Sequence, residues 1–399
     1  MIAEPTVLRA VERPPAIPRP EAGEVQVSCI RSFDLLETGS HQWKALLERS
    51  ERHTVFQTFE WHASWWRAYG ADFDLFVLCA ERDGELLGLA PLMLAERRLL
   101  WRRHRILHFI GLYASDYCDF IVDEAEPQVL SLLLRWLANN RQAWDALDLR
   151  NVQDSSPTLR VVPEYFAQHG YPVEVRQWSK APTHLFGDEQ ADRDLLRKKS
   201  LKRHYNHFKK NGRLEFENYK SATEILGRME TFFRQHIDRW GSTDTPSQFL
   251  DEKHRAFYRG MVSALAPTGS LLFSVVLFDA RPIAFHLGFE YEGRLIWYKP
   301  TFETALARHS PGEVLLKYLI EYAHGRGLIE LDFACGEEAF KYRFSNHTRS
   351  IYTVHVFQDR LFWRFDRLKF DIRTAIKSSP ALISFGRRFL STWYHRIWY

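Results

Sequence analysis

The sequence of 399 residues has few cysteines and no long apolar run. Its four cysteines stand at 29, 79, 118 and 335, and none belongs to a CxxC pair, so we expect neither a metal site nor a disulfide framework. No stretch approaches the roughly 18 apolar residues that a membrane-spanning helix needs. The N-terminus lacks the basic-then-apolar order of a signal peptide, and its first 24 residues read as a Pro-rich leader. We therefore expect a soluble protein of the reducing cytoplasm.

A strong charge imbalance is also missing, since the formal net charge is only +4. A general nucleic-acid binder is thus not indicated, but two segments concentrate the positive charge. Residues 197–213 hold eight Lys or Arg and no acid, which suits either a solvated helix face or a site for an anionic acceptor, tRNA or membrane phosphate. Residues 360–399 hold nine Lys or Arg against two Asp among many aromatic side chains. This tail fits peripheral contact with an anionic membrane, or a C-terminal helix docked on the preceding domain.

Apolar and aromatic residues, by contrast, are plentiful, at 45% and 15% of the chain. That is enough for two buried cores, and we expect domains at 25–180 and 181–358 with a tail from 359. The predicted strands are 25–30, 75–80, 86–94, 106–110, 145–150, 171–177, 271–278, 283–291, 294–299 and 351–357. The predicted helices are 43–51, 60–69, 127–141, 157–169, 222–240 and 249–265. Both halves run from helices through antiparallel strands to a helix and a strand, an α/β (α+β) order.

The most informative segment is 307–342, which reads as a loop, an amphipathic helix, a short buried strand and an acid-rich loop. Backbone N–H groups at a helix N-terminus, together with the helix dipole, favour binding of an anion such as phosphate. Pro311 suits the first helical turn, where its missing N–H costs nothing. Ser310 and Glu313 have the spacing of a capping box, which is compatible with anion binding.

Acid–base side chains follow that strand. Transfer to an amine needs a base that takes a proton from the attacking nitrogen and an acid that protonates the leaving group. Several side chains that follow the predicted helix could act as this base or this acid, or could bind an anionic substrate: Asp332, Glu337, Glu338, Lys341 and Tyr342. His286 on the strand 283–291 is a further candidate base, although a lone His in a strand is more often structural. The acidic residues could equally lie in a solvated turn.

A second polar cluster stands in the first half, where Asp116, Tyr117 and Asp119 separate two apolar strand segments. They could line a cleft that binds the hydroxyl or amine of a substrate. The alternative is a bulged strand with Asx-turn hydrogen bonds.

The sequence resembles the FemAB-like, BioF2-type branch of the GNAT acyltransferase superfamily, the CelD/BcsL-like family linked to exopolysaccharide or cellulose production. The resemblance covers about residues 25 to 358. It rests on FQTFEWHASWWRAYG (56–70), SDYCDF (115–120), LRKKSLKRHYNHFKKNG (196–212) and above all the block 281–344, with RPIAFHLGF, YKPTFETALARHSPGEVLL, RGLIELDF and GEEAFKYRF.

The resemblance implies two tandem GNAT-like domains, each with a mixed, mostly antiparallel sheet flanked by helices. It also implies an acyltransferase that moves an acetyl or longer acyl group from acyl-CoA to an amino or hydroxyl acceptor, such as a saccharide. The donor would lie on Arg308, His309, Ser310 and Gly312, although GNAT loops usually carry more glycine. Arg239-Trp240, at the end of a predicted helix, also matches the pattern, with Trp240 as a substrate-binding residue; the alternative is an Arg stacked on a core Trp.

Two other functions remain open. In one, the donor is an aminoacyl-tRNA, as in FemAB-type enzymes, and the basic segment 197–213 would bind it. In the other, the protein is a catalytically silent scaffold in a polysaccharide assembly complex.

Overall fold

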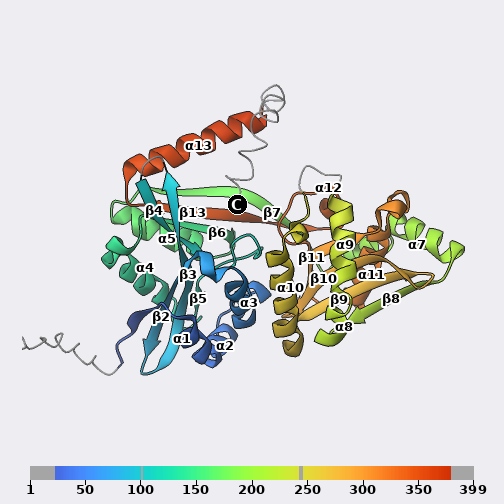
Figure 1. Ribbon diagram of the computed structural model, residues 1–399, viewed down its shortest axis with the longest axis horizontal. Coiled ribbons are helices and arrows are strands. Elements are labelled where there is room, and N and C mark those ends of the chain that lie inside the picture. Colours follow the sequence, from blue (N-terminus) through green and yellow to red (C-terminus); the bar gives the residue numbers. More distant parts are fainter. Residues whose placement is uncertain (1–22, 100–101, 242–245, 379–399) are drawn as a thin grey trace, which may run out of the picture.

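The computed structural model describes residues 23–99, 102–241 and 246–378. The leader up to residue 22 and the tail from 379 lie outside these ranges. Within them, thirteen strands form one mixed sheet in the order β1-β2-β3-β4-β6-β13-β7-β12-β11-β10-β9-β8, with β5 beside β3. Figure 1 shows an N-terminal half on the left and a C-terminal half on the right. The expected α/β (α+β) fold, with a mixed, mostly antiparallel arrangement of strands flanked by helices, is confirmed, and the two expected sheets are joined into one.

The N-terminal half is a curved sheet with helices on both faces. Its strands are β1 (Gln26–Ile30), β2 (Asp74–Arg82), β3 (Glu85–Leu99), β4 (Arg102–Phe109), β5 (Ile121–Val122) and β6 (Ala146–Gln153). Its helices are α1 (Phe33–Thr38), α2 (Ser40–Glu48), α3 (Phe59–Tyr69), α4 (Val129–Asn139) and α5 (Thr158–Gln168). In α3, Trp61 and Trp65 are buried one turn apart, and Thr58 caps the helix by accepting a hydrogen bond from the Trp61 N–H at 3.3 Å.

The C-terminal half repeats this arrangement. Its strands are β8 (Leu214–Tyr219), β9 (Leu271–Phe278), β10 (Arg281–Tyr291), β11 (Arg294–Phe302) and β12 (Glu330–Asp332). Its helices are α6 (Glu189–Leu196), α7 (Lys199–Asn211), α8 (Ala222–Leu226), α9 (Met229–Trp240), α10 (Glu252–Leu265), α11 (Pro311–Gly325) and α12 (Ala339–Arg343). Helix α13 (Arg360–Ser378) follows the last strand. The single helix predicted over 222–240 is wrong, because the chain breaks at Gly227 into α8 and α9.

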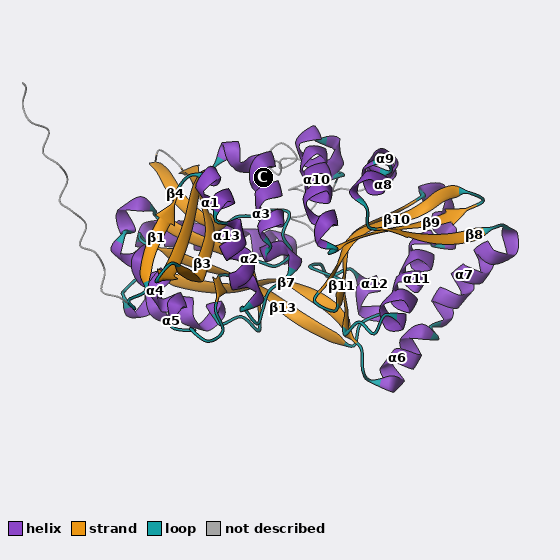
Figure 2. Ribbon diagram, turned by 90° about the horizontal axis from the view of Figure 1, so that it is seen from below, coloured by secondary structure: helices purple, strands orange, loops and turns teal. Residues whose placement is uncertain are grey.

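Two long strands join the halves. β7 (Val173–Leu185) and β13 (His347–Phe357) pair antiparallel, and Figure 2 shows them running from one half into the other. β13 pairs with β6 of the first half, while the end of β7 pairs with β12 of the second. Both strands are longer than the sequence predicted, and the domain boundary expected at 180 falls inside β7.

The largest apolar cluster crosses between the halves. Phe56 and Trp61 of the first half lie 5.9 Å, ring to ring, from Phe289 of β10, and Trp61 is 5.5 Å from Phe257 of α10. These edge-to-face contacts are all buried. The two halves therefore share one core, which fixes the loops where they meet. None of the described helices is long and apolar enough to cross a membrane.

Candidate active site

The site lies beside the C-terminal part of β11. β11 pairs with β12 only through Arg294–Ile296 and Glu330–Asp332, so from Trp297 onward β11 has no partner on that side among the described strands. A bulge interrupts its pairing with β10 at the same point, because two residues of β11, Trp297 and Tyr298, lie opposite one residue of β10, Gly288. Helix α11 connects β11 to β12, and its first turn lies beside the end of β11.

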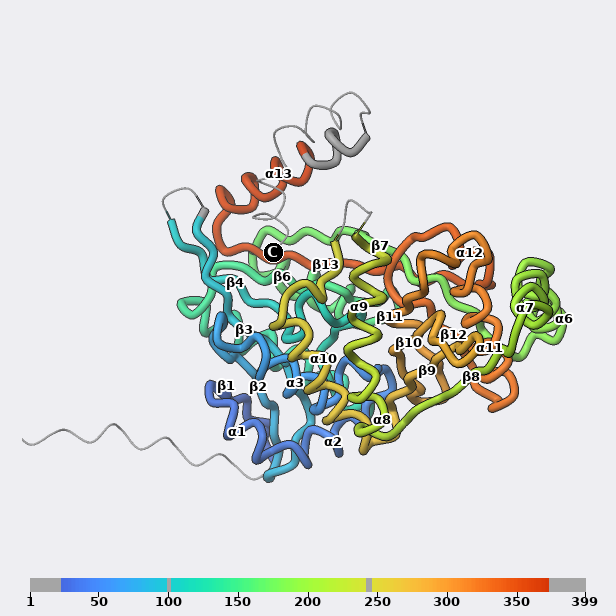
Figure 3. The backbone as a smooth tube through the Cα atoms, turned by 45° about the vertical axis from the view of Figure 1, so that its right-hand side comes forward, coloured from blue at the N-terminus to red at the C-terminus, as the bar shows by residue number. Residues whose placement is uncertain are grey.

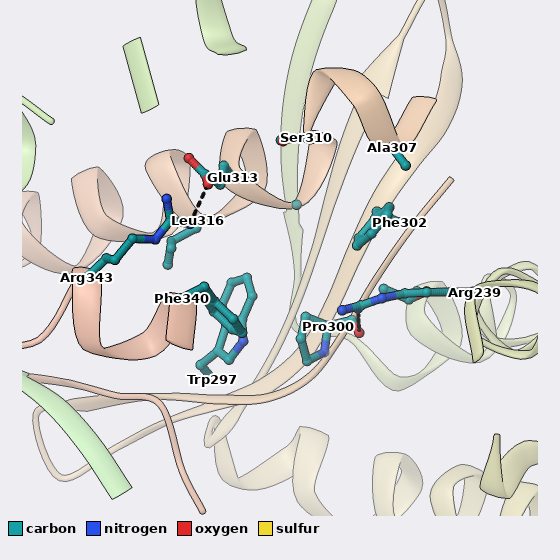
Figure 4. A pocket seen from close by; sticks show the side chains of 12 residues that line it. Arg239, Trp297, Pro300, Phe302, Ala307, Ser310, Glu313, Leu316, Phe340 and Arg343 are labelled. Atoms are coloured by element: carbon teal, nitrogen blue, oxygen red, sulfur yellow. Dashed lines mark hydrogen bonds and ion pairs between the residues drawn. The ribbon is translucent and has the colours of Figure 1, made fainter. Parts of the chain in front are cut away.

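A pocket of about 160 Å³ lies beside this part of β11. Figure 4 shows it between β11, the first turn of α11, α12 and the end of α9. It is lined by Arg239, Trp297, Pro300, Thr301, Phe302, Ala307, Ser310, Gly312, Glu313, Leu316, Phe340 and Arg343. Three of these have buried polar atoms to which no described residue forms a hydrogen bond: Trp297 Nε1, Thr301 Oγ1 and Glu313 Oε2. Because buried polar groups are nearly always paired, these atoms are available to a ligand.

The first turn of α11 opens into the pocket. Ser310 adopts the left-handed conformation (φ 52°, ψ 59°), and Pro311 occupies the first helical position. The expected capping box is wrong: the Ser310 side chain makes no capping hydrogen bond, and Glu313 instead pairs with Arg343 at 2.7 Å. The first N–H groups of a helix have no intrahelical acceptor, so that of Gly312 can donate to an anion. Gly312 also keeps the entrance open, since a Cβ there would lie 3.2 Å from the Phe302 ring.

Arg239 brings a positive charge to the same pocket. Its Nη1 donates to the Pro300 carbonyl at 2.8 Å, and its guanidinium lies 4.4 Å above the Phe302 ring. Burial lowers the pKa of Arg239 to about 10, an effect that the charge of Glu338 partly opposes. No carboxylate of the described residues is within 4.0 Å of this cation. A buried guanidinium that no described carboxylate neutralises favours an anionic ligand.

The predicted donor residues Arg308 and His309 do not line the pocket. Arg308 Nε donates to His309 Nε2 at 2.9 Å, and the His309 ring stacks on His207 of α7 at 3.7 Å. The loop before α11 therefore packs against the basic helix α7, which Figure 3 places at the outer edge of the molecule. Ser310 and Gly312, predicted with them, do line the pocket.

Asp332 and Tyr117, predicted for different roles, are direct partners. Tyr117 Oη donates to both carboxylate oxygens of Asp332 at 2.8 Å, and the Ala334 N–H donates at 2.7 Å. Arg349 lies 3.9 Å from Asp332 and binds Glu330 through two contacts at 2.5 and 2.7 Å. Burial raises the pKa of Asp332 to about 6, helped by the Glu330 charge and opposed by Arg349. The pair thus ties the first half to the end of β12.

Lys341 stabilises the loop after β12. Its buried Nζ donates to the Cys335 carbonyl at 2.9 Å and lies 3.0 Å from Glu338 Oε2. Gly336 has φ 131°, and a Cβ there would come within 2.7 Å of Lys341 Nζ. The other two catalytic candidates of this loop, Glu337 and Tyr342, are exposed.

Asp116 and Lys299 form a second polar group where the halves meet. Cys335 Sγ donates to the Asp116 carbonyl at 3.0 Å, and Tyr298 Oη donates to the Ala114 carbonyl at 2.7 Å, so the 114–116 loop lies against β11. Burial raises the pKa of Asp116, and the charges of Lys299 and Lys341 oppose the shift. Burial lowers the pKa of Lys299, which the Asp116 charge opposes. Neither side chain has a hydrogen bond or an ion pair within 4.0 Å among the described residues.

The remaining candidates have structural contacts. His286 is fully buried, stacks on Trp297 at 5.1 Å, and has its pKa lowered by burial to about 3. Asp119 accepts hydrogen bonds from Thr158 Oγ1 at 2.5 Å and the Phe120 N–H at 2.9 Å, away from Asp116. Trp240 ends α9 and stacks on His236 at 5.8 Å, while the pocket is reached by its neighbour Arg239.

Sequence reasoning missed Lys299, Trp297 and Thr301, and gave Arg239 no role of its own. Trp297, Lys299 and Thr301 lie on β11, inside the block 281–344 that carried the family resemblance. Their place in this block is the signal in the sequence that could have found them. Which of them face the pocket depends on the bulge in β11, which strand alternation does not reveal.

Comparison with known proteins concerns the family and the fold. Residues 196–342 match the family model described as an acetyltransferase (GNAT) domain. A search of the curated proteins found no sequence match.

Two solved structures share the fold over most of the chain. The crystal structure of FemX is 11% identical, covers 81% of this chain and 97% of its own, and has a TM-score of 0.58. The C-terminal domain of a putative lysylphosphatidylglycerol synthetase from Agrobacterium fabrum is 12% identical, covers 84% of this chain and 96% of its own, and has a TM-score of 0.52. At such identities the likeness concerns the fold alone.

Proposed function

We propose that the protein transfers an acetyl or longer acyl group from acyl-CoA to an amino or hydroxyl group of a second substrate. One observation carries the proposal: a pocket beside the C-terminal part of β11 has the first turn of α11 and the Arg239 cation at its wall. A phosphate-bearing thioester needs an anion site beside a cavity that can hold its chain, and this pocket offers both.

The donor would lie along the pocket. Its diphosphate would accept a hydrogen bond from the Gly312 N–H and would face the Arg239 guanidinium. The dipole of α11 adds to the positive charge at this position. The pantetheine amides would pair with Trp297 Nε1 and Thr301 Oγ1, which have no hydrogen-bond partner in the described part of the chain. The acyl carbon would then be near the bulge of β11, beside Lys299.

The acceptor would approach from the side where the halves meet. Asp116 would take the proton from the attacking nitrogen or oxygen as the new bond to the acyl carbon forms and the carbon–sulfur bond breaks. The Lys299 ammonium would stabilise the negative charge that develops on the carbonyl oxygen. The thiolate leaves and takes its proton from water. In this scheme Asp332 and Lys341 position the loops and do not touch the substrates.

The direct test is thioester turnover by the purified full chain. We expect acetyl-CoA to bind in titration calorimetry and free thiol to appear in the presence of amino sugars or other amines. Asp116→Asn should keep donor binding and lose turnover. A donor that binds but is never consumed with any acceptor would favour the scaffold instead. The class of acceptor, and a role in exopolysaccharide or cell-envelope synthesis, follow only from the resemblance and belong to the same proposal.

One observation favours a second candidate, transfer from an aminoacyl-tRNA. The ring stacking of His207 on His309 holds the basic helix α7 against the loop that leads into the pocket. Lys202, Arg203, Lys209 and Lys210 on this helix are exposed. Gel-shift titration with charged tRNA decides between the donors: tight, salt-sensitive binding without thioester turnover would replace acyl-CoA as the donor.

A further inference from the structure

Among the described residues, helix α13 contacts the rest of the molecule through the face that carries Phe362, Asp366 and Phe370. Phe362 packs against His104 of β4 at 4.1 Å and against Phe357 of β13 at 5.3 Å, ring to ring. Arg176 of β7 binds Asp366 at 3.0 Å and lies 4.2 Å above the Phe370 ring. These contacts fix the orientation of the helix on the N-terminal half.

A different face carries apolar side chains that contact little. Leu361 is 68% exposed, Phe365 43%, Leu368 55% and Ile372 50%. Their spacing of four, three and four residues places them in one row along the helix. We call these four residues the apolar row. A contiguous row of large apolar groups on a surface helix marks a binding surface.

Positive charges flank the apolar row. Arg360, Arg364, Arg367 and Lys369 are exposed on the same helix, while Asp366 is already paired with Arg176. The neighbouring β3–β4 hairpin adds four exposed arginines, at 97, 98, 102 and 103. The contact of Arg102 with Asp359 at 3.6 Å brings this hairpin to the start of α13. Figures 1 and 3 show β4 and α13 on the same side of the molecule.

We propose that α13 and the β3–β4 hairpin bind the surface of an anionic phospholipid bilayer. The apolar row would enter the boundary between headgroups and acyl chains, and the arginines would contact lipid phosphates. A second copy of the chain fits this surface less well, because pairing two such faces would bring their cations together. The proposal concerns attachment alone and does not depend on the transfer reaction.

The test is co-sedimentation of the full chain with vesicles. We expect binding to phosphatidylcholine vesicles containing about 30% phosphatidylglycerol, weaker binding to pure phosphatidylcholine, and a decrease with added salt because the phosphate contacts are screened. The triple variant Leu361→Ser, Phe365→Ser, Leu368→Ser keeps the charge and should bind at least about tenfold more weakly. The control Leu35→Ser changes an exposed leucine of α1, on the opposite side of the molecule, and should bind like the wild type.

Thermal unfolding and light scattering complete the experiment. The triple variant should unfold at the wild-type temperature, since the replaced side chains contact little. Absence of sedimentation with anionic vesicles would overturn the proposal, as would equal binding by the triple variant and the wild type. A wild-type dimer that the triple variant converts to a monomer, without vesicle binding by either, would assign the surface to a second copy.

Discussion

The Tyr117 hydroxyl donates to both carboxylate oxygens of Asp332, at 2.8 Å each, across 215 positions of sequence. The two residues belong to different halves of the sheet, and both are buried. A hydrogen bond to a buried carboxylate is stronger than one between neutral groups, because the charge has no water to solvate it. This pair therefore helps to hold the 114–117 loop, and with it Asp116, against the ends of β11 and β12.

We expect Tyr117→Phe to lower the free energy of unfolding by about 1–3 kcal/mol, because Asp332 keeps its Ala334 and Arg349 contacts but loses the hydroxyl. Urea denaturation measures the change. Tyr342→Phe, at an exposed position, is the matched control and should leave the midpoint in place. Equal midpoints for the two variants would show that the Tyr117–Asp332 contact contributes nothing to stability.

Alanine substitutions at two glycines of α11 separate an effect on donor binding from an effect on the helix itself. A Cβ at Gly312 would meet the Phe302 ring at 3.2 Å, whereas a Cβ at Gly325 would meet nothing within 4 Å. We expect Gly312→Ala to weaken acetyl-CoA binding about tenfold, because it narrows the entrance beside the anion-binding N–H. Gly325→Ala should bind the donor like the wild type. Calorimetric titration of both variants checks this, and an unchanged affinity of Gly312→Ala would place the donor elsewhere.

The proposed roles of Asp116 and Lys299 predict a bell-shaped dependence of kcat/KM on pH. The acid limb should lie above the ordinary carboxyl pKa of 3.8, and the basic limb below the ordinary lysine pKa of 10.5, because burial raises the first and lowers the second. Asp116→Asn should reduce turnover about a hundredfold or more.

Lys299→Arg gives the sharper result. Arginine keeps its proton to much higher pH, so residual activity of this variant should lose the basic limb. A basic limb at the wild-type pH in Lys299→Arg would mean that another group controls it.

Buried neutral histidines make stability depend on pH. His286 and His236 are buried, and burial lowers the pKa of each from 6.5 to about 3. Below pH 6.5 these histidines therefore bind protons in the unfolded chain but stay neutral in the folded chain. The free energy of unfolding consequently decreases as the pH falls from 6.5 towards 3. Asp332 acts in the opposite sense. Its pKa is raised from 3.8 to about 6 in the folded chain, so between these pH values the folded chain holds a proton that the unfolded chain has lost, and stability increases as the pH falls.

We expect His286→Gln to reduce the slope of unfolding free energy against pH by about 1.4 kcal/mol per pH unit between pH 6 and 5. Urea midpoints at a series of pH values provide the measurement. The comparison uses slopes, so a general loss of stability in the variant does not affect it. An unchanged slope would show that His286 is not the neutral buried group described here.

Local patterns were enough to predict most elements. The apolar segments 271–278 and 283–291 predicted the strands that the structure pairs as β9 and β10, because the signals for a strand act over a few residues. For the same reason, Pro311 and the apolar period after it correctly placed the start of α11. The break at Gly227 was missed, since an isolated glycine in a helical pattern is only a weak signal.

The site itself depended on long-range contacts. The sequence determined that 307–342 forms a loop, a helix and a strand, and it indicated an anion at the helix N-terminus. Only the tertiary structure decided that Arg239, Trp297 and Thr301 line the pocket while Arg308 and His309 turn to α7. Only the tertiary structure also brought Asp116 beside Lys299 and tied Tyr117 to Asp332. The physical reason is that burial and bonding partners arise from sheet pairing and from a core shared by both halves, and residue spacing along the chain does not encode either.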